Sequence, residues 1–139
     1  MIKIEINRLN EGFHMEALNE QGNSVHIDAS PDIGGGNNGM RPMQLLLAAM
    51  GGCSSIDIIN ILKKQRQDLR DIKITVTGER EKDAVPSLYT DVHAHFRLYG
   101  NIDPDKAEKA VSLSVEKYCS VAKTLEKSAR VTYSFEIIK

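Results

Sequence analysis

A run of apolar residues near the middle of the chain constrains the fold more than any other feature. From Met43 to about Gln65 the apolar residues keep helical spacing, and Pro42 stands where its missing N–H is not needed, at the first helical position. The half that contains residues 45–50, LLLAAM, is apolar on all sides, which is typical of a helix buried all round. A chain of 139 residues has few elements with which to surround such a helix. We therefore predict a long buried central helix that a second copy of the chain helps to cover.

Strands and a second helix are predicted around this central helix. Period-2 alternation of apolar and polar residues indicates strands at residues 2–6, 13–18, 25–27, 72–76, 92–98 and 131–137. Asp103 followed by Pro104 is typical of a helix start, and helical spacing continues to Tyr118, with a break expected near Cys119. Blocks of strands and helices in this order predict an α+β fold with an antiparallel sheet, in a single domain over residues 1–139.

Composition and charge exclude several classes of protein. The net charge is −1 without a basic or acidic tail, so nucleic acid is not an expected partner. The longest uncharged stretch, Pro42 to Ile56, is 15 residues long and includes polar residues, and we expect it not to span a membrane. The alternating N-terminus lacks the apolar core of a signal peptide. We expect a cytoplasmic protein.

The two cysteines are the first candidates for chemistry. Cys53 follows Gly51-Gly52 within the central helix, where each glycine costs roughly 1 kcal/mol relative to alanine. Such a cost indicates a close backbone crossing or the approach of a ligand, although Cys53 is equally explained as a small buried side chain. Cys119 stands where a new helix is expected to begin, and this position, with Lys117 and Lys123 nearby, predicts a lowered thiol pKa. A buried core cysteine is the alternative here too.

Two histidines form a weaker candidate site. His93 and His95 are two residues apart on a predicted strand, so both side chains point to the same face. This spacing suits a metal ion, which Cys53 would be able to join. However, Arg97 continues the same alternation, which is typical of the solvated face of a sheet. We therefore predict an exposed or partly exposed pair that binds no metal.

Two segments resemble the OsmC/Ohr family of thiol-dependent hydroperoxide reductases. Residues 41–53, RPMQLLLAAMGGC, are similar to the family's proline-led, Leu- and Ala-rich helix that ends in a small-small-Cys sequence. Residues 110–121, AVSLSVEKYCSV, are similar to the helix that carries the family's second cysteine. The separation of 66 residues between the two cysteines is similar as well, and so is the order of elements over essentially the whole chain.

The resemblance implies a fold, an assembly and a reaction. It implies an intertwined homodimer with two sites at the interface, in which Cys53 attacks an organic hydroperoxide and Cys119 resolves the sulfenic acid as a disulfide. A dithiol reductant then reopens the disulfide, and no cofactor is expected. The same helix implies substrate-binding roles for Arg41, Met43, Leu46 and Met50 beside an apolar pocket. The ligand is thus an organic hydroperoxide or another small apolar molecule.

One departure from the family leaves alternatives open. Peroxidases of this family carry a glutamate ten residues before the first cysteine, paired with an arginine that lowers the thiol pKa, and this chain has Met43 there. Arg41 lies roughly 18 Å along the helix from Cys53, so it would reach only the other subunit's Cys53, and Arg8 and Arg97 remain candidates. Three functions therefore remain open. They are a peroxidase, an apolar pocket that binds or transforms another molecule, and a structural or metal-binding dimer. Proximity of Cys53 to Cys119 would favour the first.

Overall fold

The computed structural model describes residues 1 to 139 and confirms the α+β class. In chain order the elements are β1 (Glu5–Arg8), β2 (Met15–Leu18), β3 (Ser24–Ile27), η1 (Pro31–Ile33), α1 (Pro42–Lys64), β4 (Asp68–Arg80), β5 (Tyr89–Asn101), α2 (Pro104–Leu113), η2 (Ser114–Tyr118), α3 (Ser120–Leu125) and β6 (Arg130–Ile138). The chain divides into two compact units, Met1–Leu46 and Leu47–Lys139. Whether both belong to a single domain stays a prediction.

The first unit is built on a small antiparallel sheet in the order β1-β2-β3. The predicted hairpin is confirmed, because β2 pairs with β3 through a turn closed by the backbone N–H of Asn19 on the carbonyl of Asn23. Three apolar side chains of this region, Ile4, Ile6 and Val25, are about half exposed at 52%, 56% and 49%. A three-stranded sheet of four-residue strands depends on a covered apolar face for its stability. The unit therefore exposes apolar surface that it does not itself cover.

A buried carboxylate organises the glycine-rich loop that follows β3. Asp28 is 1% exposed, and its carboxylate accepts hydrogen bonds from the backbone N–H groups of Ala29 at 2.7 Å and Asn38 at 3.0 Å. The Asn38 N–H, with those of Ala29 and Gly36, holds the pKa of Asp28 below its usual range, although burial acts in the opposite direction. The loop is thus closed by an ionised side chain that its own backbone satisfies.

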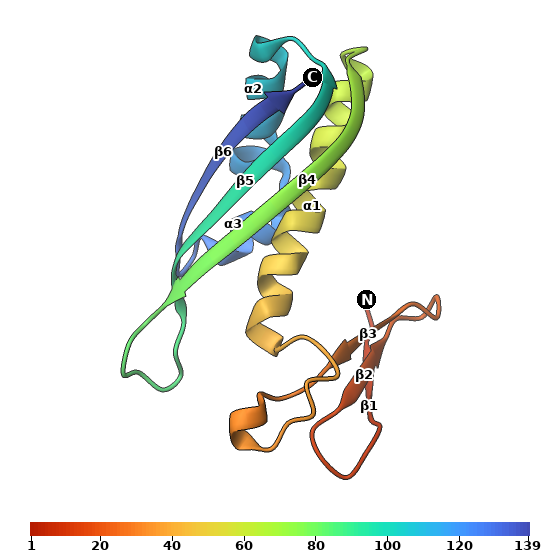
Figure 1. Cartoon of the computed structure of the whole chain (residues 1–139), viewed down its shortest axis with the longest axis vertical. Helices are drawn as coiled ribbons and strands as arrows, with labels where there is room; N and C mark the ends of the chain where they lie inside the picture. The colour runs from red at the N-terminus through yellow and green to blue at the C-terminus, as the bar shows by residue number, and fades with distance from the viewer. The chain divides into compact units, whose positions relative to one another are not determined.

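The second unit contains the longer sheet, in the order β4-β5-β6, with α1, α2 and α3 on one side of it (Figure 1). Alternate residues of β5 form the core side of this sheet, since Val92, Ala94, Phe96 and Leu98 are fully buried. The Cβ of an alanine at position 51 would lie 3.1 Å from a methyl group of Val76, which shows that α1 packs closely on β4.

The prediction of an antiparallel sheet is wrong for the last strand. β4 and β5 form the predicted antiparallel hairpin, with Ile74 opposite Phe96. β6 runs parallel to β5, with Phe135 opposite Phe96. The residues between these two strands fold as α2, η2 and α3, a crossover long enough to return the chain to the end of the sheet from which β5 started. Apolar alternation is the same in both directions, so it predicts the strand but not its orientation.

The central helix is buried along one face only within a single chain. Met50, Ser54, Ile58 and Leu62, spaced four residues apart, are fully buried. On other faces Ile56 and Ile59 are 70% and 42% exposed. A single chain thus leaves part of the helix uncovered, because one three-stranded sheet covers only the side that it touches. Coverage of the remaining faces by a second copy stays a prediction.

The length of α1 also exceeds the apolar stretch counted in the sequence. The helix has 23 residues with a mean hydropathy of 1.8 over its most apolar 18-residue window, so by length and composition alone it is able to cross a membrane. This finding corrects the expectation that the stretch is too short. It is weak evidence for a membrane span, because the core helix of a soluble protein meets the same criterion.

Candidate functional site

Cys53 lies on α1 at the point where the helix crosses the sheet. Gly51 is buried against the side chains of Val76 and Ile74, so close side-chain packing, rather than the crossing of another backbone, accounts for this glycine. A Cβ at Gly52 would meet nothing within 4 Å. A larger residue would therefore fit at position 52 within one chain. Cys53 itself is partly exposed and not in a disulfide. Cys53 is therefore less buried than a core cysteine in this chain.

Cys119 lies at the predicted helix break, which is confirmed. The helical path of α2 widens into the single π-type turn of η2, and Cys119 then adopts an extended conformation with φ −73° and ψ 102°. Its backbone N–H donates to the carbonyl of Ser114 at 2.7 Å, and its sulfur accepts the N–H of Ala122 at 3.3 Å, capping α3. The side chain of Cys119 is completely buried. The break thus points this thiol into the core rather than to the surface.

The two cysteines, which are 66 positions apart in the sequence, are neighbours in the fold. The nearby Cys53 thiol contributes to a raised pKa of Cys119, and the hydroxyl of Ser54, the residue after Cys53, lies 3.3 Å from the Cys119 sulfur. Both cysteines are free thiols. This proximity favours a redox pair over two unrelated core cysteines.

Two serines complete the surroundings of Cys119, and sequence analysis missed both. The hydroxyl of Ser54 donates to the Cys119 sulfur at 3.3 Å, and the hydroxyl of Ser114 donates to the backbone carbonyl of Ser54 at 2.9 Å. Both serines are fully buried. Ser54 follows Cys53 directly and lies one helical turn after Met50, so its helical position was a signal that it faces the core.

The prediction of a lowered pKa for Cys119 is wrong. Burial raises the pKa of the Cys119 thiol, and the neighbouring Cys53 raises it further, while the Ser54 hydroxyl and the Ala122 N–H act in the opposite direction. The lysines that were expected to lower it have other contacts. Lys123 pairs with Glu126 at 3.3 Å, and the Lys117 ammonium lies 5.4 Å from the centroid of the Tyr118 ring.

The three candidate arginines have local roles or face elsewhere. Arg41 donates to the Gly39 carbonyl at 2.8 Å and to Asn37 at 2.9 Å, and Arg8 donates to carbonyls of its own turn. Arg97 alternates with buried Phe96 on β5, so it lies on the face of the sheet opposite α1. Within one chain, Arg97 therefore does not reach Cys53.

The proposed substrate-binding residues differ in environment. Arg41, Met43 and Leu46 belong to the first unit, where Arg41 and Met43 are partly buried and Leu46 is exposed. Met50 belongs to the second unit and is completely buried, with its carbonyl oxygen 4.0 Å from the Cys119 sulfur. Met50 thus forms part of the core beneath the thiol pair. The binding roles of all four residues stay predictions.

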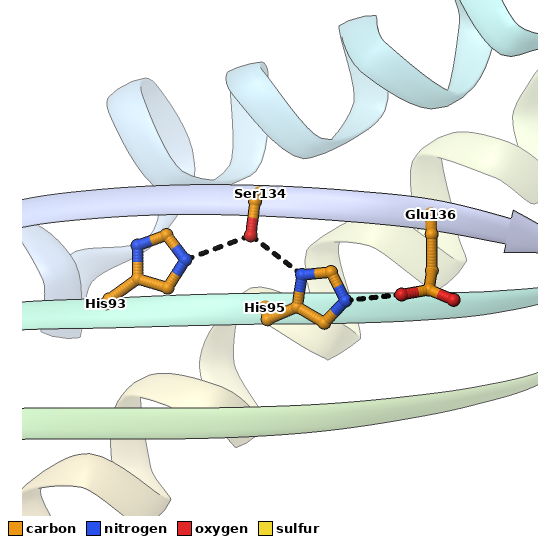
Figure 2. Close-up of polar contacts among 4 residues, drawn as sticks. All are labelled: His93, His95, Ser134 and Glu136. Atoms are coloured by element: carbon orange, nitrogen blue, oxygen red, sulfur yellow. Dashed lines mark hydrogen bonds and ion pairs between the residues drawn. The ribbon is translucent and has the colours of Figure 1, made fainter.

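His93 and His95 belong to a continuous hydrogen-bonded row on the outer face of the sheet (Figure 2). The ring nitrogens of His93 lie 2.7 Å from the Thr132 hydroxyl and 2.9 Å from that of Ser134, and those of His95 lie 2.7 Å from Ser134 and 2.8 Å from Glu136. Both rings are partly exposed, as predicted.

The Glu136 carboxylate at the end of this row determines which atoms donate and which accept in its hydrogen bonds. The Glu136 carboxylate only accepts, so Nε2 of a neutral His95 carries the hydrogen and Nδ1 accepts from the Ser134 hydroxyl. Ser134 in turn accepts from Nε2–H of His93, whose Nδ1 accepts from Thr132. Every ring nitrogen thus has a partner, and the structure contains no group of three His, Cys, Asp or Glu residues able to hold a metal ion. The absence of a metal stays a prediction.

Comparisons with known proteins identify the class to which this fold and thiol pair belong. The family model described as "OsmC-like protein" matches residues 34–134, and the chain belongs to this family. Protein YhfA of Escherichia coli K12 is 40% identical over 129 residues, covering 92% of each chain. A hypothetical protein from Aquifex aeolicus VF5 has a structure similar to this one, with a TM-score of 0.84, 31% identity and coverage of 99% of this chain and 96% of that chain.

A third comparison concerns the fold alone. The organic hydroperoxide resistance protein OsmC from Legionella pneumophila is similar, with a TM-score of 0.74, 17% identity and coverage of 98% of this chain and 96% of that chain. The OsmC/Ohr-like fold expected from the sequence is therefore confirmed. Membership of this family supports a redox or peroxidase role in general terms.

Proposed function

We propose that this protein is a thiol-dependent peroxidase that reduces organic hydroperoxides with Cys53 and Cys119. The observation that carries the proposal is the proximity of the two cysteines, of which Cys53 is partly exposed and Cys119 is buried. Family membership supports the same chemistry. We further propose that two chains assemble around α1, that a dithiol serves as reductant and that the protein acts in the cytoplasm.

Accessibility assigns different roles to the two sulfurs. Cys53 is partly exposed, whereas Cys119 is completely buried, so a hydroperoxide meets Cys53 first. The Cys53 thiolate attacks one oxygen of the O–O bond, an S–O bond forms, and the alkoxide leaves and takes up a proton as an alcohol. Cys53 is thereby oxidised to a sulfenic acid while the hydroperoxide is reduced.

Cys119 is the resolving thiol of the second step. Its sulfur attacks the Cys53 sulfenic acid, a disulfide forms, and the hydroxyl leaves as water with the Cys119 proton. A disulfide requires Cα atoms about 4.4–6.8 Å apart, and the proximity of the two cysteines favours its formation. A dithiol then reduces the disulfide by exchange and becomes a disulfide itself.

The experiment treats the reduced full-length protein with one equivalent of cumene hydroperoxide, counts thiols and maps bonds by mass spectrometry. Wild type is expected to lose both thiols to a bond within one chain. Cys119→Ser is expected to stop at a Cys53 sulfenic acid that dimedone traps, and Cys53→Ser is expected to react no faster than free cysteine. Retention of both thiols in wild type after minutes with excess hydroperoxide would contradict the proposal.

A second candidate function is binding or conversion of another small molecule by the same site without peroxidase activity. Met43 in place of the family's glutamate favours it, and so does the local engagement of Arg41 and Arg8. Without an acid–arginine pair, no residue of this chain is identified that would lower the pKa of the Cys53 thiol. Fast formation of the Cys53–Cys119 bond would exclude this alternative, and unreactive thiols would support it.

A further inference from the structure

Ser114 lies at the junction of α2 and η2, is fully buried, and uses all three of its polar groups in hydrogen bonds. Its backbone N–H donates to carbonyls of α2. Its carbonyl accepts the N–H of Cys119 at 2.7 Å, and its hydroxyl donates to the Ser54 carbonyl on α1 at 2.9 Å. This one residue therefore connects α1 to the backbone of Cys119.

The π-type turn of η2 makes this connection possible. In an α-helix the N–H of each residue bonds to the carbonyl four positions earlier, whereas the N–H of Cys119 bonds to Ser114, five positions earlier. The wider turn thus returns the Cys119 backbone to the same residue whose side chain contacts α1. Single turns of this kind are rare in proteins and occur frequently at functional sites.

The two segments joined by Ser114 carry the two cysteines. Ser54 follows Cys53 directly on α1, and the Ser54 hydroxyl donates to the Cys119 sulfur at 3.3 Å. Two hydrogen bonds therefore join the residue beside Cys53 to the Cys119 segment, one at the sulfur and one at Ser114. The side chains of Ser54, Ser114 and Cys119 are fully buried, so water does not compete for either bond.

We infer that Ser114 is a positioning residue of the thiol pair, which holds the Cys119 segment beside Cys53 and so raises the effective concentration of one thiol at the other. The inference rests on the proposed function, in which these two sulfurs form a disulfide. Two groups that a protein holds in place react as if they were far more concentrated, and a small loss of positioning lowers this advantage steeply. Ser114 acts through the Ser54 carbonyl and the Cys119 backbone and not on a sulfur.

The first test measures disulfide formation without peroxide, so its failure is distinguishable from failure of the peroxidase proposal. The reduced full-length protein is equilibrated with glutathione. The protein dithiol gives two electrons and two protons to one glutathione disulfide, which becomes two thiols, and the Cys53–Cys119 disulfide forms. Alkylation of the remaining thiols and mass spectrometry give the equilibrium constant.

Ser114→Ala is expected to lower this equilibrium constant roughly fivefold, the effect of one hydrogen bond. The variant leaves no buried acceptor unpaired, because the Ser54 carbonyl keeps its bond within the α-helix. Ser112→Ala is the matched control and is expected to leave the constant unchanged, since the Ser112 hydroxyl bonds to the Lys109 carbonyl of its own helix. Ser114→Thr keeps the hydroxyl, and its constant is expected to stay close to that of wild type.

A second measurement separates positioning from a purely structural role. A hydrogen bond that only stabilises the fold contributes equally to the reduced and the oxidised protein. A bond that brings the thiols together is itself strengthened by the disulfide, because coupling between two interactions is reciprocal. Ser114→Ala is therefore expected to lower the thermal midpoint of the oxidised protein more than that of the reduced protein.

Several results would overturn the inference. They are a wild-type protein that forms no Cys53–Cys119 disulfide in glutathione, an unchanged constant in Ser114→Ala, a lowered constant in Ser114→Thr, and equal destabilisation of both redox states. A lowered constant in Ser114→Ala, together with wild-type thiols that do not react with hydroperoxide, would support positioning and contradict the peroxidase proposal alone.

Discussion

The hydroxyl of Ser54, on the central helix, donates a hydrogen bond to the sulfur of Cys119 at 3.3 Å, and both side chains are fully buried. A donor directed at sulfur favours the thiolate over the thiol. The bond therefore offsets part of the rise in pKa that burial imposes on Cys119. This relationship makes the second step of the proposed reaction dependent on both pH and Ser54.

Replacement of Ser54 by alanine is expected to slow the closing of the disulfide. Because the pKa of Cys119 is raised, its thiolate is scarce at neutral pH, and the step accelerates as pH rises toward that pKa. Ser54→Ala raises the pKa further, so the step slows roughly 3- to 10-fold at pH 7, and the profile moves to higher pH. The decay of the dimedone-reactive Cys53 sulfenic acid measures this rate between pH 6 and 10.

Ser55→Ala is the matched control for this experiment. The Ser55 hydroxyl bonds to the Gly51 carbonyl of its own helix rather than to a cysteine, so its loss should leave the pH profile unchanged. Identical profiles for wild type and Ser54→Ala would show that the hydrogen bond does not govern the reactivity of Cys119.

Assembly is expected to depend on the exposed face of α1. Ile56 is 70% exposed in a single chain, and a lysine there would bring a charge into a contact between two helices. We predict that Ile56→Lys weakens self-association roughly tenfold or more, measured by sedimentation at micromolar concentration. Val85→Lys, at a fully exposed residue of the β4–β5 connection, should leave association unchanged. A stable folded wild-type monomer under these conditions would show that the obligate homodimer prediction is wrong.

The stability of the glycine-rich loop is expected to depend on pH through Asp28. Folding lowers the pKa of this carboxyl, so the stabilisation is complete above the ordinary aspartate pKa of about 3.9 and is lost as pH falls through the lower folded value. We predict that Asp28→Asn lowers the denaturant midpoint at pH 7 and that the difference from wild type shrinks at pH 3. Asp32→Asn, an exposed acid of the same loop, should have little effect at either pH. A difference that does not change with pH would assign the effect to packing.

The histidine row is expected to bind no metal, because its ring nitrogens already have partners in Thr132, Ser134 and Glu136. Elemental analysis of the purified protein should find no stoichiometric zinc, and the His93→Ala/His95→Ala variant should have the same content as wild type. One zinc ion per chain that disappears in the double variant would overturn this expectation.

Local patterns were enough to predict most of the elements and the thiol pair. Alternation predicts β5 and β6, the Asp103-Pro104 pair predicts the start of α2, and the break before Cys119 is confirmed. These features depend on residues a few positions apart, where the repeat of a helix or strand decides which side chains share a face. The two cysteine segments identified the family in the same way.

Other properties arise only when distant segments pack together. The parallel orientation of β6, the Ser54–Cys119 bond across 65 positions and the Ser114–Ser54 bond across 60 positions all belong to this group. The pKa of Cys119 was mispredicted because a helix start beside lysines suggested an exposed thiol, whereas packing buries it. Periodicity shows which face of an element is apolar but not which element covers that face, and burial and long-range hydrogen bonds depend on the covering element.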